Sequence, residues 1–180
     1  HTASGCVYVY DPAARTVQQV LSGVSGASAL ALSADGETLY VADLASRCVW
    51  AVDPTGRELT AGGKNCAVFA EGLPGCPGAL AVEEDGTVDI GYRWARLSWL
   101  EDHADGTLLR GAALRLSESM QERLVSLPAS AISAERFTPD GVLLCSYGGK
   151  QLGSVTALCP AGNRVYLGIA EENTVKWIRI

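Results

Sequence analysis

Residues 31–43, ALSADGETLYVAD, read as two short strands joined by a tight turn. Alternating apolar residues flank an Asp-Gly pair, which is a strong short-range signal for a β-hairpin. A close copy, LAVEEDGTVDIGY, occupies residues 80–92, and a third hairpin is expected at Ala161-Gly162 within SVTALCPAGNRVYLGIA. The chain therefore repeats one antiparallel unit.

The spacing of these hairpins indicates a β-propeller. The interval of about 50 residues between Gly36 and Gly86 holds four apolar strand-like runs, which is the size of one propeller blade. A blade buries both of its faces only when it stacks on copies of itself. We therefore predict an all-β propeller segment of about three to three and a half four-stranded antiparallel blades with one α-helical insertion. The expected parts are an outer hairpin of an incomplete blade at 1–25, full blades at 26–75 and 76–150, and a final partial blade at 151–180.

The predicted insertion covers about residues 93–128. Alternation stops there, and apolar residues recur every four positions, which is typical of a helix. Pro128 is expected to end the helical part. The repeating apolar positions are Leu108, Ala112, Leu116, Met120 and Leu124.

Composition and charge exclude several classes of protein. Hydrophobic residues make up 48% of the chain and glycines number 20, which fits a globular fold with many turns. The net charge of -6 argues against a nucleic-acid partner. No apolar run of about 18 residues is present, so no transmembrane segment is predicted. The opening HTASGCVYV lacks the order of residues that a signal peptide requires.

The six cysteines lack the spacing and the histidine partners of a zinc site. Most lie in apolar strand-like runs, so we expect buried, reduced thiols. A bridge between Cys66 and Cys76 is the alternative in an oxidising compartment.

The order of segments resembles the strictosidine synthase-like family, a group of six-bladed propellers in the gluconolactonase and paraoxonase superfamily. The stretches that carry the resemblance are GCVYVYDPAARTVQQV, ALALSADGETLYVAD, RCVWAVD, VFAEGLPGCPGAL, GSVTAL and VYLGIA. They follow the family's order over nearly the whole chain and match the C-terminal half of a family member. The resemblance thus implies the same fold as the repeat.

The resemblance also implies where a metal ion and a catalytic base would lie. Metal-using relatives hold a hard cation such as calcium with Asn and Asp oxygens at positions that fall on Ser28, Gly78 and Ala79 here. The family's catalytic glutamate falls on Thr156. Glycine and alanine have no side-chain oxygen, and a threonine hydroxyl is not basic near neutral pH. We therefore expect no cofactor, calcium included, and name no catalytic residue.

Trp94 joins these four positions as a candidate pocket-lining residue, because the family's helical segment caps the substrate pocket. The alternative is that the helical stripe packs on its own propeller.

Other polar residues are expected to be structural. Asp89 interrupts an inner strand and needs a partner, for which Arg93 is the candidate. Asp43 is expected to accept hydrogen bonds at a strand end, and Glu171 and Glu172 to be solvated loop charges. His103 lies in a polar link, and no nucleophile motif accompanies it.

Two functions from different classes follow. The first, by resemblance, is an enzyme that condenses amines with aldehydes or hydrolyses esters or lactones of small organic molecules. The second is a catalytically silent propeller that binds a protein or an apolar small molecule through the ring top and helical cap. Two copies could complete a propeller ring as a homodimer. The resemblance suggests the secretory pathway or endomembrane system, for which the sequence itself carries no signal.

Overall fold

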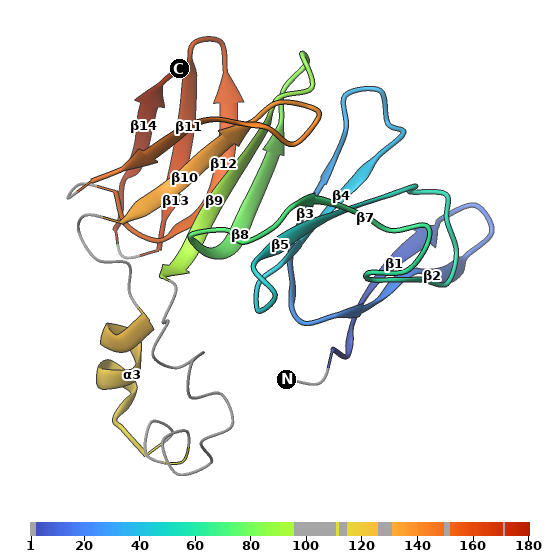
Figure 1. Cartoon of the computed structure of the whole chain (residues 1–180), viewed down its shortest axis with the longest axis horizontal. Helices are drawn as coiled ribbons and strands as arrows, with labels where there is room; N and C mark the ends of the chain where they lie inside the picture. The colour runs from blue at the N-terminus through green and yellow to red at the C-terminus, as the bar shows by residue number, and fades with distance from the viewer. Residues whose placement is uncertain (1–2, 96–110, 112–114, 126–130, 150–151, 171) are drawn as a thin grey trace.

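A computed structural model describes residues 3–95, 111, 115–125, 131–149, 152–170 and 172–180. These residues form four β-sheets that follow one another along the chain (Figure 1). The chain is an all-β partial propeller, as the hairpin repeat predicts.

Two of the sheets within the described residues have four strands and two have three. The first contains β1 (Gly5–Asp11), β2 (Thr16–Val24) and β6 (Leu59–Thr60). The second contains β3 (Ala27–Leu32), β4 (Leu39–Asp43), β5 (Cys48–Val52) and β7 (Ala67–Ala70). The third contains β8 (Gly75–Val82), β9 (Val88–Ala95), β10 (Ile132–Phe137) and β11 (Leu143–Gly148). The fourth contains β12 (Val155–Ala161), β13 (Arg164–Ile169) and β14 (Val175–Arg179).

The Asp-Gly hairpins have the same local geometry in the second and third sheets. Gly36 and Gly86 have φ angles of 77° and 85°, in the left-handed region that favours glycine. Their amides donate to Ser33 and Glu83 carbonyl oxygens at 2.9 and 3.0 Å. The repeated motif is therefore a repeated turn.

Three apolar cores lie between successive sheets. Neighbouring residues of one strand serve different cores, because successive side chains point to opposite faces of a sheet. Val41 of β4 packs with Leu21 and Val24 of the first sheet. Tyr40 packs on the other side with Ile90 of the third sheet. This sharing makes each sheet dependent on its neighbours, as in other repeat architectures.

Strand β6 is a feature that the sequence analysis did not anticipate. It belongs to the connection between β5 and β7 but pairs in parallel with β2 of the first sheet. The Glu58 amide donates to the Gln19 carbonyl oxygen at 3.0 Å, and the Ala61 amide to that of Ser22 at 2.9 Å. Through this pairing, the β5–β7 connection of the second sheet is hydrogen-bonded to the first hairpin.

The insertion contains the helix α3 (Glu118–Val125), which lies apart from the sheets (Figure 1). Met120 of the predicted stripe is 55% exposed, so the stripe is not buried at that position. Leu108, Ala112 and His103 lie outside the described residues. The cap over the ring stays a prediction. No described helix is long and apolar enough to cross a bilayer.

None of the six cysteines, all of which lie in the described residues, forms a disulfide, so the bridge between Cys66 and Cys76 expected for an oxidising compartment is absent from this structure. Cys48 and Cys66 are buried as expected, whereas Cys159 is exposed. Burial raises the pKa of the Cys48 thiol to about 12, which keeps it protonated near neutral pH.

Candidate functional site

The first strands of three successive sheets, β3, β8 and β12, lie next to one another, because β8 contacts both β3 and β12. The Ser28 hydroxyl on β3 donates to the Pro77 carbonyl oxygen on β8 at 2.7 Å. A Cβ added at Gly78 would lie 3.3 Å from the Val155 carbonyl oxygen on β12. These are the innermost strands of the partial ring, which is where a propeller has its central channel.

The structure brings four of the five predicted pocket-lining residues onto this inner edge. Ser28 lies on β3, Gly78 and Ala79 on β8, and Thr156 on β12. Trp94 lies on β9 opposite Cys76, and its ring is stacked under the Arg93 guanidinium at 4.9 Å. The inner edge therefore collects small, uncharged side chains.

The residues at the family's metal positions do not fit a metal ion. Ser28 already donates its hydroxyl hydrogen to a backbone carbonyl. A Cβ at Gly78 would lie 2.7 Å from the Arg93 Cβ, so no ligand side chain fits there without a shift. Ala79 is buried in the core between the third and fourth sheets. Over the part of the chain that the structure describes, no three His, Cys, Asp or Glu residues gather closely enough to hold a metal.

Thr156 has the geometry of a hydroxyl bound to its own sheet. Its side chain is exposed, and its Oγ1 donates to the Gly168 carbonyl oxygen on the paired strand at 3.3 Å. Among the described residues no activating contact to this hydroxyl is found, so the Thr156 side chain can form hydrogen bonds but cannot act as a base.

A buried ion-pair cluster lies in the third sheet. Asp89 is paired as expected, but the predicted partner Arg93 is wrong. Arg136 on β10 faces Asp89 across the strand pair and donates from Nε and Nη2 to its two carboxylate oxygens, both at 2.8 Å. Arg136 also contacts Glu83. Arg93 is exposed on the same strand as Asp89.

The protonation of this cluster follows from its burial. The Asp89 carboxylate raises the pKa of the Arg136 guanidinium, which stays charged. Burial raises the pKa of the Glu83 carboxyl, and the nearby Arg136 charge opposes that rise. Two carboxyl groups and one guanidinium therefore share this buried place in the third sheet.

A second buried carboxylate, Glu135, was missed by the sequence analysis. It accepts hydrogen bonds from the Tyr92 hydroxyl at 2.5 Å and from the Ser146 hydroxyl at 2.9 Å. Burial raises the pKa of the Tyr92 phenol well above its usual value, and the Glu135 hydrogen bond adds to the rise. The only signal in the sequence was an acidic residue within an apolar strand.

Two other predictions concern loop and strand-end carboxylates. Asp43 is buried and accepts hydrogen bonds from the Ser25 and Ser46 amides and from Trp50 Nε1, which confirms its structural role. Glu172 is exposed and pairs with Lys176, which lowers the pKa of its carboxyl. Glu171 lies outside the described residues.

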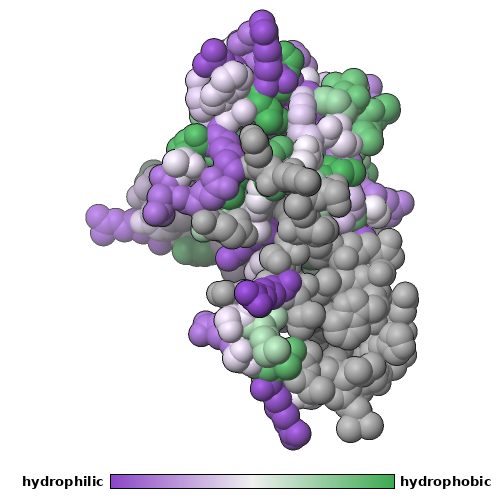
Figure 2. Space-filling view, turned by 90° about the vertical axis from the view of Figure 1, so that its left-hand side faces the viewer, coloured by the Kyte–Doolittle hydropathy of each residue, from purple (hydrophilic) through white to green (hydrophobic). Residues whose placement is uncertain are grey.

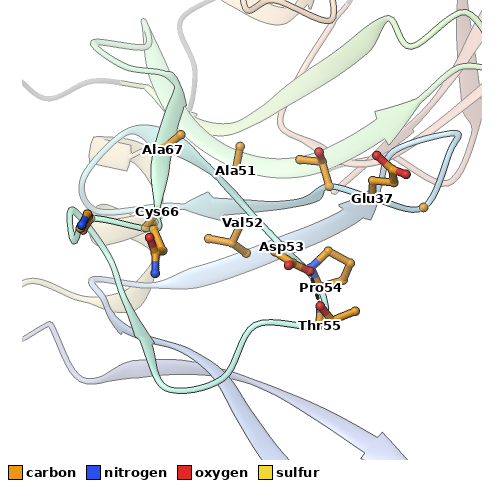
Figure 3. Close-up of a pocket in the computed structure, with 12 residues that line it drawn as sticks. Glu37, Ala51, Val52, Asp53, Pro54, Thr55, Cys66 and Ala67 are labelled. Atoms are coloured by element: carbon orange, nitrogen blue, oxygen red, sulfur yellow. Dashed lines mark hydrogen bonds between the residues drawn. The ribbon is translucent and has the colours of Figure 1, made fainter.

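A hollow of about 690 Å³ opens at the opposite end of β3 from Ser28 (Figure 3). Glu37 of the β3–β4 hairpin, Asp53 after β5 and Lys64 before β7 line it. The Asp53 carboxylate accepts hydrogen bonds from the Thr55 amide and hydroxyl at 2.7 and 2.6 Å. This carboxylate therefore stabilises its own turn.

Radially stacked antiparallel sheets with their first strands at the centre define a partial β-propeller. Residues 1–96, more than half of the chain, match the family described as SMP-30/gluconolactonase/LRE-like region. The chain belongs to this family. No curated protein matches it in sequence.

Several solved structures share the fold at low sequence identity. A gluconolactonase from Xanthomonas campestris is 18% identical, with a TM-score of 0.59 over 92% of this chain and 42% of that one. A luciferin-regenerating enzyme is 17% identical, with a TM-score of 0.58 over 92% and 44%. Regucalcin from Agrobacterium tumefaciens, a calcium-binding protein, is 19% identical, with a TM-score of 0.56 over 96% and 47%.

The chain thus spans less than half the length of these similar proteins. The comparisons confirm the gluconolactonase-type superfamily that the sequence resemblance implies. They do not single out the strictosidine synthase-like branch.

Proposed function

We propose that β3, β8 and β12 form the uncharged part of the wall of a central site for a small organic molecule. In the assembled propeller, the proposed chemistry is hydrolysis of a lactone or ester. Membership of the SMP-30/gluconolactonase/LRE-like family and the likeness to a gluconolactonase support this chemistry. The observation that carries the proposed site is the contact between Ser28 and Pro77, which holds two inner strands together at the ring centre.

These residues can bind and orient a neutral ring. The exposed Thr156 presents a hydroxyl oxygen that can accept a hydrogen bond, because its hydrogen is donated to Gly168. Gly78 has no side chain, and Ala79 faces the core between the third and fourth sheets, so neither residue offers a reactive group. None of these groups removes a proton from water, so the catalytic base and any metal ligands come from residues other than these.

A non-catalytic binding function is the second candidate. The observation that favours it concerns the family's metal positions. Gly78 and Ala79 have no side-chain oxygen there, and the Ser28 hydroxyl donates to the Pro77 carbonyl oxygen. Such a propeller would bind a protein or an apolar small molecule through the ring top and the predicted helical cap. Amine–aldehyde condensation, which the strictosidine synthase-like resemblance implies, needs a base where Thr156 stands and is disfavoured by that residue.

Hydrolysis of δ-gluconolactone and phenyl acetate by the 180-residue protein tests the first proposal. We expect turnover above the buffer background, and we expect added calcium not to change it. We also expect weaker ligand binding, measured by NMR, in Thr156→Trp than in the control Thr174→Trp. Thr174 is an exposed threonine on the last hairpin, outside the inner edge. Binding without turnover would favour the non-catalytic candidate. Equal ligand binding in the two variants would overturn the placement of the site at this inner edge.

A further inference from the structure

Arg93 lies at an irregular place in the third sheet, beside the innermost strand. The pairing of β8 with β9 shifts its register twice, once between Cys76 and Pro77 and once between Pro77 and Ala79. These shifts leave Arg93 of β9 and Gly78 of β8 without a directly opposite residue. Bulges of this kind re-aim side chains and are over-represented next to active sites.

Gly78 makes room for the Arg93 side chain. A Cβ added at Gly78 would lie 2.7 Å from the Arg93 Cβ, closer than two such atoms can approach, and 3.3 Å from the Val155 carbonyl oxygen of β12. The Arg93 side chain therefore begins beside β8 and β12, the strands that carry Gly78 and Thr156. Because these are innermost strands, Arg93 belongs to the inner edge of the partial ring.

The Arg93 guanidinium has no counter-ion within the described residues, whereas Arg136 on the neighbouring strand contacts both Asp89 and Glu83. Arg93 is exposed, and its guanidinium lies over the Trp94 ring, 4.9 Å from the ring centre. Stacking covers one face of a guanidinium and leaves the N–H groups in its plane free to donate. The positive charge is therefore held in place and open to a ligand.

The inner edge carries no negative charge that would neutralise Arg93. The four predicted positions on β3, β8 and β12 are all uncharged. The chain as a whole has a net charge of -6, so its average field repels anions and a site for an anion needs a local positive group. Arg93 supplies such a group beside the proposed central site.

We propose that Arg93 binds the carboxylate of a small organic acid at the central site. A planar guanidinium donates two parallel hydrogen bonds to the two oxygens of a carboxylate, which is a strong and specific geometry. The inference rests on the function proposed above and names the ligand. Hydrolysis of a lactone consumes one water and breaks the ring C–O bond, and the hydroxy acid that forms loses a proton and is a carboxylate near neutral pH. Arg93 then holds this ring-opened product.

Binding of D-gluconate, compared with that of D-glucitol, tests the assignment. The two molecules share a polyol chain and differ at one end, which is a carboxylate in gluconate and a hydroxymethyl group in glucitol. In Arg93→Gln, we expect gluconate binding, measured by NMR titration, to weaken about tenfold or more, the loss typical of a hydrogen bond between charged groups. Glucitol affinity should not change, because glucitol has no charge for Arg93 to bind.

A lysine variant and added salt separate charge from support of the fold. Arg93→Lys keeps the positive charge but loses the forked donor, so it should retain part of the gluconate affinity that Arg93→Gln loses. Added NaCl should weaken gluconate binding in the parent protein and have little effect in Arg93→Gln, because salt screens an exposed ion pair. If Arg93→Gln does not fold, Arg93→Lys still tests the assignment, since it should weaken gluconate binding more than glucitol binding.

Arg164 provides a matched control in the fourth sheet. Its guanidinium lies over the Trp177 ring, 4.3 Å from the ring centre, which is the same kind of stacking that Arg93 makes. Arg164 pairs with Ala161, at the end of β12 away from Thr156. Figure 2 shows the side of the molecule that carries the fourth sheet, where hydrophilic residues lie among hydrophobic ones. Arg164→Gln should leave gluconate binding unchanged, because this arginine lies away from the inner edge.

The outcomes separate this inference from the proposed function. Three results would overturn the role of Arg93, whatever the hydrolysis assay gives: a parent protein that binds no gluconate, unchanged gluconate affinity in Arg93→Gln, or an equal loss of gluconate and glucitol binding in that variant. An equal loss of gluconate binding in Arg164→Gln would also overturn it. Gluconate binding that depends on Arg93, in a protein that hydrolyses no lactone or ester, would support the anion site and refute the hydrolytic proposal.

Discussion

Replacement of Arg136 by methionine probes the cluster that links β9 and β10. The change keeps an unbranched apolar stem and removes the charged guanidinium. The side chains of Asp89 and Glu83 are only 3% and 19% exposed, so both carboxylates lose their counter-ion in a poorly hydrated place. Removal of one partner from a buried pair costs about 3–5 kcal/mol.

We expect a loss near the lower end of that range, roughly 3 kcal/mol at pH 7, because Glu83 is partly hydrated. For a chain of this size, that corresponds to a fall in Tm of about 6–12 °C. Urea unfolding followed by tryptophan fluorescence measures the free energy directly. The matched control is Arg93→Met, which changes the exposed arginine that the sequence favoured and should cost less than about 1 kcal/mol.

The pH dependence gives a second reading of the same variant. Burial raises the folded-state pKa of the Glu83 carboxyl, and without Arg136 no cationic charge opposes that rise. Protonation then favours the folded variant, so its deficit relative to the parent protein should shrink between pH 7 and pH 4.5. An equal loss in Arg93→Met, or a deficit that grows on acidification, would refute the assignment of the partner.

Three further outcomes follow from the turns, the second carboxylate and the thiols. Gly86→Ala should cost about 1 kcal/mol more in unfolding free energy than Gly36→Ala, because both have positive φ but a Cβ at Gly86 would meet a proline ring at 2.9 Å. Equal losses would contradict this steric argument. Tyr92→Phe should cost about 1–2 kcal/mol in urea unfolding, since it removes one donor from a buried carboxylate; a neutral effect would mean that the bond stabilises nothing. With a thiol reagent at pH 7.5, exposed Cys159 should react first and Cys48 only after unfolding, whereas early labelling of Cys48 would show that its strand opens readily.

The sequence predicted the class of fold because the information is local. Strand alternation and an Asp-Gly turn involve residues a few positions apart, and Gly36 and Gly86 adopt the conformation that such turns need. Stacking follows from hydrophobic patterning on both faces of each strand. The sequence analysis missed β6, because Leu59 and Thr60 form a strand only by pairing with β2 of the first sheet, whereas the strands on either side of them in the sequence belong to the second sheet.

For the candidate site, the sequence names positions but not contacts. Ser28, Gly78 and Thr156 were found through the family's segment order, and the innermost strands do bring them to one edge. Sequence alone could not show that the Ser28 hydroxyl donates to the Pro77 carbonyl oxygen, or that Arg93 fills the space beside Gly78. The first contact joins strands of two sheets, and the second joins neighbouring strands of the third sheet.

What the sequence determined by itself is the repeated antiparallel unit, its turns and the absence of a side-chain oxygen at Gly78 and Ala79. The tertiary structure decided which charges neutralise one another. Asp89 lies four residues from Arg93 but pairs with Arg136, 47 residues away. Residues four apart on a strand are separated by about 13 Å, whereas directly opposite residues of paired strands are about 5 Å apart. The pairing register between β9 and β10, which lie on either side of the insertion in the sequence, therefore determines which arginine pairs with Asp89.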